Sequence, residues 1–246
     1  MNLLPSFLGF ISDAHGNFGA FLKGIELMKK KGVEQVFFLG DALGYIPSVE
    51  VFRWLKNKRI PCILGNHENQ LLEHDLNRTK NPVYRFNDIL RQLSHDDIEF
   101  MQTWPTQRIV ATPVGPLHLV HGAPGNPVDQ YIYPDTCLTP YVKHAKAPTV
   151  VMGHTHRPFI RTEYGHMFVN VGSCGMPRDD SRYGSVGILD VRKKGHWQII
   201  RYNIEKASKE VLDQYDVAEE VRNLMRFRRI TFNGKELPWT IEQEYS

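Results

Sequence analysis

The chain has 246 residues, of which 41% are hydrophobic and 23% are charged, a composition that is ordinary for a soluble globular protein. No apolar run approaches ~20 residues, which excludes a membrane-spanning helix. The three cysteines have no paired spacing, so they exclude a disulfide scaffold and favour a reducing compartment. The net charge of +3 is only a weak argument for a nucleic-acid partner. The N-terminus has no basic segment before its short apolar run, so we expect no signal peptide and a cytoplasmic location.

Short apolar runs that end at glycine or at a polar residue recur along the chain, and each is typical of a buried strand. They cover residues 7–12, 36–39, 61–64, 117–120 and 149–152. Between the first three runs, Asn17 is placed to cap a helix that reaches Lys31, and Pro47-Ser48 opens a second helix through about Lys56. This alternation of strand and helix predicts a parallel half-sheet through residue 64.

The rest of the chain divides into a helical insert, a series of strands and a helical tail. The insert covers about residues 68–103 and contains the capping-box-like sequence Ser94-His-Asp-Asp97. Strands are expected at about 107–111, 117–121, 149–153, 158–163, 166–171, 185–190 and 196–203. Helices are expected over 205–215 and 217–227. We therefore predict one domain over residues 1–203 with a helical extension over 204–246 packed on it, whose last stretch either frays or packs across a neighbour in a homodimer.

Five polar clusters directly follow the five apolar runs. They are Asp13-Ala-His15, Gly40-Asp41, Gly65-Asn66-His67-Glu68, His121-Gly122 and Gly153-His154-Thr155-His156. Because ligands bind outside the carboxyl ends of strands in open α/β sheets, these clusters suggest one shared site. Carboxylate and imidazole together suit Mn, Fe, Ni or Zn, so we interpret the site as a two-metal centre.

We expect the ligands to divide into two sets that share Asp41, because a carboxylate can bridge two ions and a neutral imidazole cannot. One ion would take Asp13, His15, Asp41 and His156, and the other would take Asp41, Asn66, His121 and His154. Residues i and i+2 of an extended strand point the same way, which would let Asp13 and His15 converge, although a loop can also place them. A lone histidine is usually a surface or core residue, and Asp, Gly and Asn favour turns, but turn chemistry does not easily put such residues at five strand ends.

The ordered set Asp-x-His, Gly-Asp, Gly-Asn-His-Glu, His-Gly and Gly-His-x-His resembles the calcineurin-like metallophosphoesterase superfamily. The resemblance implies an α/β fold of two facing mixed β-sheets flanked by helices, whose second half the strands after residue 106 would form. It also implies a metal-ligand role for the seven residues named above and a catalytic role for His67. Asn170-Val-Gly-Ser173 and Pro177-Arg-Asp179 are similar to a segment of small prokaryotic phosphodiesterases of this superfamily.

One block departs from the family pattern. Many members read Gly-Asp-x-x-Asp, where the second Asp orients the catalytic His, and the protein phosphatases follow it with Arg. Here Gly44 stands in place of that carboxylate and Tyr45 in place of the Arg. The resemblance to Ser/Thr protein phosphatases is therefore poor, and the sequence leaves open what orients His67.

The resemblance implies a metal-dependent phosphoesterase that acts mainly on phosphodiesters, with some phosphomonoesterase activity. In it a hydroxide bridging two divalent ions attacks phosphorus, and His67 acts as general acid. Its partner would be a small phosphate-ester substrate, which the mildly basic charge also suits, and candidate substrate contacts are Asn17, Tyr45 and Arg178. Alternatives are a non-catalytic scaffold on the same fold, a nuclease or a dinucleoside polyphosphate hydrolase. The basic segment Arg226-Phe-Arg-Arg229 is a weak signal for nucleic acid, and we favour solvated Arg side chains on a docked helix.

Overall fold

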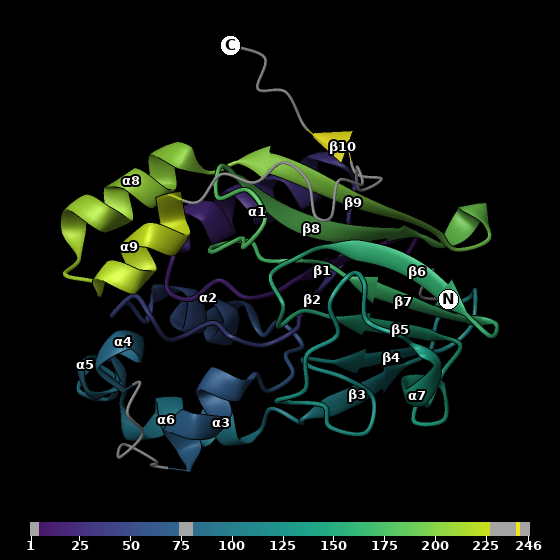
Figure 1. Ribbon diagram of the computed structural model, residues 1–246, viewed down its shortest axis with the longest axis horizontal. Coiled ribbons are helices and arrows are strands. Elements are labelled where there is room, and N and C mark those ends of the chain that lie inside the picture. Colours follow the sequence, from purple (N-terminus) through teal and green to yellow (C-terminus); the bar gives the residue numbers. More distant parts are fainter. Residues whose placement is uncertain (1–4, 74–80, 227–239, 242–246) are drawn as a thin grey trace.

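A computed structural model describes residues 5–73, 81–226 and 240–241. In this part of the chain two mixed sheets face each other, with helices on their outer sides (Figure 1). The first sheet has the strand order β10-β9-β8-β1-β2 and the second has the order β3-β4-β5-β7-β6. The predicted fold class is therefore confirmed.

The strands are β1 (Phe7–Ile11), β2 (Gln35–Phe38), β3 (Gln107–Val110), β4 (Leu117–Val120), β5 (Thr149–Met152), β6 (Phe159–Glu163), β7 (His166–Asn170), β8 (Tyr183–Asp190), β9 (His196–Asn203) and β10 (Thr240–Ile241). The helices are α1 (Phe18–Lys30), α2 (Glu50–Lys58), α3 (Asn66–Leu72), α4 (Asn81–Tyr84), α5 (Phe86–Leu90), α6 (His95–Gln102), α7 (Thr139–Val142), α8 (Glu205–Gln214) and α9 (Glu219–Arg226), with a 3-10 turn η1 (Val191–Lys193).

Alternation of side chains along β1 builds the layers. Leu8 and Phe10 point into the space between the sheets, where they join Leu119 and other apolar residues of the second sheet. Ile11 points the other way and packs with Phe21 of α1. The first sheet therefore has an apolar core on each face, and its central strands β1 and β8 are buried along almost their whole length.

Three expectations about the elements were wrong. The run 61–64 forms an isolated bridge between Phe38 and Cys62 and not a strand. Two backbone hydrogen bonds join it to Phe38 of β2, and the Leu64 amide then donates to the Pro105 carbonyl oxygen instead. The second helix begins at Glu50 and not at Pro47-Ser48. Strands β8 and β9 return to the first sheet, where β8 pairs antiparallel with β1, and do not extend the second.

Helices α8 and α9 of the extension pack on the same body as the sheets. Val211 of α8 and Val221 of α9 share an apolar cluster with Tyr45, Ile46 and Met176. The predicted N-cap is present, since the Asn17 side chain accepts a hydrogen bond from the Ala20 amide at the start of α1. None of the helices in the described ranges has the length and apolar character needed to cross a membrane.

Candidate metal centre

The five polar clusters meet at one edge of the sandwich, where β1, β2, β4 and β5 end. Each predicted ligand residue is buried there, with an exposed fraction between 0 and 9%. The side chains form three overlapping groups whose ligand-type atoms lie within 4.8 Å of one another. These groups are Asp13, His15 and His156; His15, Asp41 and His67; and Asp41, His121 and His154. The structure thus brings together the residues that the sequence singled out.

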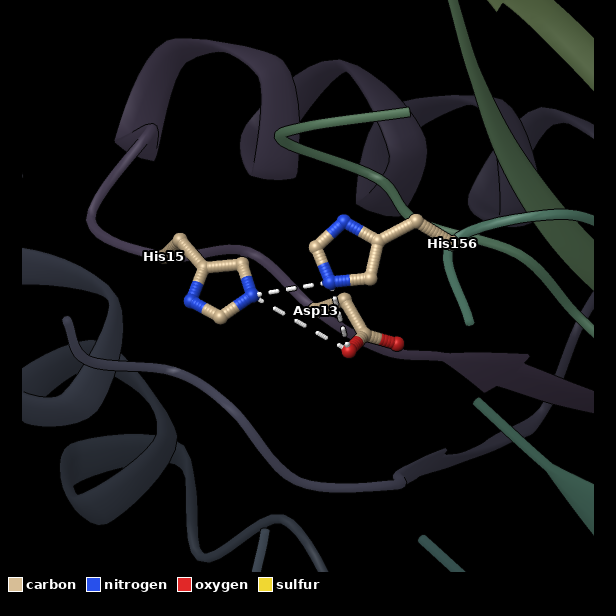
Figure 2. A group of neighbouring side chains, drawn as sticks. All are labelled: Asp13, His15 and His156. Atoms are coloured by element: carbon tan, nitrogen blue, oxygen red, sulfur yellow. Dashed lines mark hydrogen bonds and ion pairs between the residues drawn. The ribbon is translucent and has the colours of Figure 1, made fainter. Parts of the chain in front are cut away.

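The first group is centred on Asp13 (Figure 2). Its Oδ1 atom lies 3.3 Å from His156 Nε2 and 4.0 Å from His15 Nε2. The two imidazoles are stacked, and their Nε2 atoms are 3.1 Å apart. His15 Nε2 also lies 3.7 Å from Asp41 Oδ2, which links this group to the second.

The third group gathers around His121. Its Nε2 atom lies 3.3 Å from Asp41 Oδ2 and 3.2 Å from Asn66 Oδ1. The ring of His154 lies 4.8 Å from the ring of His121. Asp41 therefore lies beside both the first group and the third, and His154 and His156 fall in different groups.

Backbone carbonyl groups select the tautomer of each candidate histidine ligand. The Nδ1 atoms of His15 and His121 face the oxygens of Leu43 and Leu39, at 3.1 and 2.7 Å. His156 Nδ1 faces the Met176 oxygen in the same way. Since a carbonyl oxygen accepts only from an N–H, a neutral ring must carry its proton on Nδ1 and leave a lone pair on Nε2, inside the site. His154 is reversed: its Nε2 faces the oxygen of Asp129 at 3.0 Å, which leaves the lone pair on Nδ1.

This arrangement fits a bound cation. Burial lowers the pKa of both His15 and His156 well below the usual value, so both rings are neutral and present lone pairs to each other across 3.1 Å. The buried Oδ1 atom of Asp13 has no hydrogen-bond partner. Burial, reinforced by the charge of Asp41, raises the pKa of Asp13 to about 7. A divalent ion among these atoms would remove each of these unfavourable contacts.

The backbone that carries the ligands is held in an uncommon conformation. Asp13, His15, Asp41, His154 and His156 all have positive φ, between 48° and 66°. Non-glycine residues enter this region at a cost, and such residues cluster at functional sites. Asp13 and His15 therefore converge through a left-handed turn after β1 and not through extension of the strand.

A buried carboxylate to which the sequence motifs assigned no role holds two of the loops. Glu68 accepts hydrogen bonds from the amides of Asp41, Leu43 and Gly65, at 2.8, 3.0 and 3.2 Å. Burial and the nearby Asp41 raise the pKa of Glu68 to about 7, against the three amides, which favour the charged form. The signal was available, since Glu68 stands at the third position of a helix that begins just after Gly65.

The three candidate substrate residues differ in their surroundings. The Asn17 side chain is engaged inside the protein, because its Nδ2 donates to the Gly175 oxygen and to Ser208. Arg178 borders the centre, where its charge lowers the pKa of His15 and His156, and it donates to the Tyr45 hydroxyl at 2.9 Å. A contact with substrate stays a prediction for all three.

The long segment from residue 122 to 146 borders the site, as its length led us to expect. Besides the oxygen of Asp129, it supplies Tyr131, whose ring stacks on His154 with 3.8 Å between centroids.

Of the basic residues in the helical insert, Arg78 and Lys80 lie outside the described residues, and Arg85 is paired with Asp88 and Asp216.

A comparison with models of protein families identifies the family of this chain. The model of the calcineurin-like phosphoesterase superfamily domain matches residues 7–194. The chain belongs to the calcineurin-like phosphoesterase superfamily. The resemblance inferred from the sequence is therefore confirmed, and the superfamily to which the chain belongs is one of metal-dependent phosphoesterases.

Several proteins are similar to this one over most of the chain. An uncharacterized protein of Methanocaldococcus jannaschii is 25% identical over 241 residues, covering 85% of this chain and 93% of the relative. The structure resembles that of a metallophosphoesterase from Sphaerobacter thermophilus, with a TM-score of 0.70 and 22% identity, and a hypothetical protein from Pyrococcus horikoshii OT3, with a TM-score of 0.74 and 20% identity. Each comparison covers 89% of this chain and 97% of the other. At these identities the solved structures show a common fold alone.

Proposed function

We propose that the protein is a phosphodiesterase that depends on two divalent metal ions, with Mn, Fe, Ni or Zn as candidates. The observation that carries this proposal is a set of unpaired acceptors at one buried centre: the neutral rings of His15 and His156 face each other with Nε2 atoms 3.1 Å apart, and the Oδ1 atom of Asp13 beside them has no hydrogen-bond partner. One ion would be held by Asp13, His15, Asp41 and His156, and the other by Asp41, Asn66, His121 and His154. When bound, such ions activate a water molecule for attack on phosphorus and neutralise phosphoryl charge.

Two groups of the chain would act directly on a phosphate ester. His67 lies against His15 and Asp41, and it is the candidate proton donor to the leaving oxygen. Arg178 makes no ion pair with any carboxylate in the described part of the chain, and its Nε atom is buried without an acceptor. Because a partly buried guanidinium with an unpaired N–H is stabilised by an anion, Arg178 is suited to bind a phosphoryl oxygen of the substrate.

A non-catalytic scaffold on this fold would need neither group. Retention of His67 beside the complete set of candidate ligands favours an enzyme. A likeness to the structure of a putative diadenosine tetraphosphatase, at 16% identity and a TM-score of 0.55, concerns the fold alone. A dinucleoside polyphosphate is therefore a second substrate to assay and not a second proposal.

The test compares hydrolysis of bis-p-nitrophenyl phosphate with that of p-nitrophenyl phosphate. The protein is stripped with a chelator and then given Mn, Ni, Zn or Mg separately. We expect activity to return with a transition metal, to favour the diester, and to be lost in Asp41→Asn. Calorimetric titration should give two bound ions per chain in the wild type. Binding of two ions without hydrolysis of either substrate or of a dinucleoside polyphosphate would contradict the enzyme and favour the scaffold.

A further inference from the structure

The structure leaves no room for a carboxylate beside His67 at position 44. Gly44 has a φ of +94°, and a Cβ atom built on it would lie 1.8 Å from His67 Nδ1 and 2.7 Å from its Cε1. The imidazole therefore packs directly against the backbone of Gly44. Its Nδ1 atom is buried and has no hydrogen-bond partner. A hydrogen bond through Nδ1 is thus not what orients this ring.

Aromatic rings surround His67 instead. Tyr84, Tyr45 and Phe86 have ring centroids 4.6, 4.8 and 5.6 Å from its own, with interplanar angles of 51°, 45° and 87°. The ring of His15 lies on a further side at 4.7 Å. We call Tyr45, Tyr84 and Phe86 the aromatic cage. Aromatic pairs prefer tilted and edge-to-face contacts, so rings on several sides restrict the imidazole to one orientation.

The cage joins the helical insert to the metal centre. Tyr84 is the last residue of α4 and Phe86 the first of α5, whereas Tyr45 follows Gly44 in the loop after β2. The two segments are tied together, since the Tyr45 amide donates to the Tyr84 carbonyl oxygen at 2.9 Å. The cage rings also contact one another: Tyr84 lies 5.2 Å from Tyr45 and 5.2 Å from Phe86.

We propose that the aromatic cage is the positioning element for His67 and acts in place of a hydrogen-bonding carboxylate. The cage fixes by shape the direction in which the imidazole presents its proton, and the insert contributes two of its three members. Tyr45, Tyr84 and Phe86 are positioning residues that act through His67. The inference rests on the proposed function, because it assigns these residues to the histidine that would protonate the leaving group.

The test separates positioning from folding through the leaving group. Tyr84→Leu removes a cage ring, Tyr84→Phe keeps it, and Phe100→Leu removes a partly buried ring of the same insert that packs on Phe52 and Trp104, away from His67. The wild type and each variant are loaded with Mn and assayed on two substrates. The leaving group of bis-p-nitrophenyl phosphate needs little protonation, whereas that of diphenyl phosphate needs more. Bound metal is measured for each protein.

We expect Tyr84→Leu to lower kcat on diphenyl phosphate by roughly 10–100-fold, because misplacing a reacting group by about 1 Å has an effect of this size. Hydrolysis of bis-p-nitrophenyl phosphate should change several-fold less. Tyr84→Phe should restore the wild-type ratio between the substrates, and Phe100→Leu should leave the ratio unchanged. In a His67→Ala background, Tyr84→Leu should add no further loss on diphenyl phosphate, since both changes remove one effect.

Three outcomes would count against the proposal in different ways. An equal loss on both substrates in Tyr84→Leu, or a loss that multiplies with that of His67→Ala, would overturn the positioning role while leaving the phosphodiesterase intact. If Tyr84→Leu does not fold, Phe86→Leu replaces it, with the same expected ratio. If His67→Ala hydrolyses diphenyl phosphate at the wild-type rate, the proton-donor role assigned to His67 fails and the cage proposal fails with it.

Discussion

The buried carboxylate of Glu68 offers the sharpest test of how the metal loops are held. In Glu68→Gln, volume is conserved but one carboxylate oxygen becomes an NH2 group. Since Oε2 accepts from Asp41 and Gly65 and Oε1 accepts from Leu43, the glutamine would place its oxygen toward the first two and leave the Leu43 amide facing a donor. An unsatisfied buried donor costs about 1–3 kcal/mol, so we expect the free energy of unfolding to fall by about that amount.

The same substitution should weaken metal binding. Asp41 borders both ligand groups, and the loop that carries it is bonded to Glu68 at two amides. Loss of a residue that supports ligands in this way lowers metal affinity by roughly 10–100-fold. Urea denaturation of the metal-free protein gives the stability, and calorimetric titration with Mn gives the affinity. Glu73→Gln, at the exposed end of the same helix, is the matched control and should change neither. A fall in stability with unchanged Mn affinity would refute the role in holding the metal loop.

Three further predictions concern other parts of the chain. Gly44→Ala should displace His67, since the added Cβ would overlap its ring, and we expect kcat on diphenyl phosphate to fall by at least about 10-fold with Mn affinity retained; unchanged kinetics would contradict this packing. Arg178→Gln should lower kcat/KM by about 10–100-fold, because a charge-assisted hydrogen bond contributes roughly 1.5–3 kcal/mol, and should raise inhibition constants for inorganic phosphate in parallel; unaltered phosphate inhibition would exclude anion binding. Burial alone would raise the pKa of Asp97, but hydrogen bonds from Lys56 and from the start of α6 outweigh it and leave the pKa lowered. Its stabilisation is therefore fully present above the unfolded-state pKa of about 4 and is lost as the pH falls through the lowered folded-state pKa. Thermal unfolding of wild type and Asp97→Asn should differ by about 1 kcal/mol at pH 7 and converge below that folded-state pKa; a difference that persists in acid would contradict this mechanism.

Most of the candidate site could be predicted because its ligands follow strands. A parallel strand ends where its neighbours end, so a polar residue at each end implies a common location. The inference needed only that Asp13, Asp41, His121 and His154 each follow an apolar run. It did not need the pairing of the strands, and it held although the run before Asn66 forms only a bridge and not a strand.

Sheet membership was less accessible, because it depends on contacts between distant parts of the chain. The two strands over 183–190 and 196–203 follow the second sheet in sequence, and neighbours in sequence usually pair. Here β8 instead pairs with β1 and lies between β9 and β1 in the first sheet. Hydrophobic patterning marks β8 as a strand buried on both faces, but it does not say which sheet contains it.

The conformations at the site were also inaccessible from residue types. Aspartate and histidine enter the left-handed region infrequently, so a sequence reader assigns Asp13 and His15 to an extended segment by default. The turn is imposed by its neighbours: the amides of Asp13 and His15 bond the carbonyl oxygens of Gly40 and Asp41 in the adjacent loop. Tertiary hydrogen bonds between two loops therefore decide where the ligands point.

The choice of tautomer follows the same logic and has a consequence for mutation. The four acceptors that fix the candidate histidine ligands are backbone oxygens, those of Leu39, Leu43, Asp129 and Met176. A carbonyl oxygen is present whatever side chain the residue carries. A substitution at one of these positions that leaves the backbone conformation unchanged therefore also leaves unchanged which histidine nitrogen faces the site. Orientation of the imidazoles is therefore built into the fold itself, whereas orientation of His67 depends on side chains that substitution can remove.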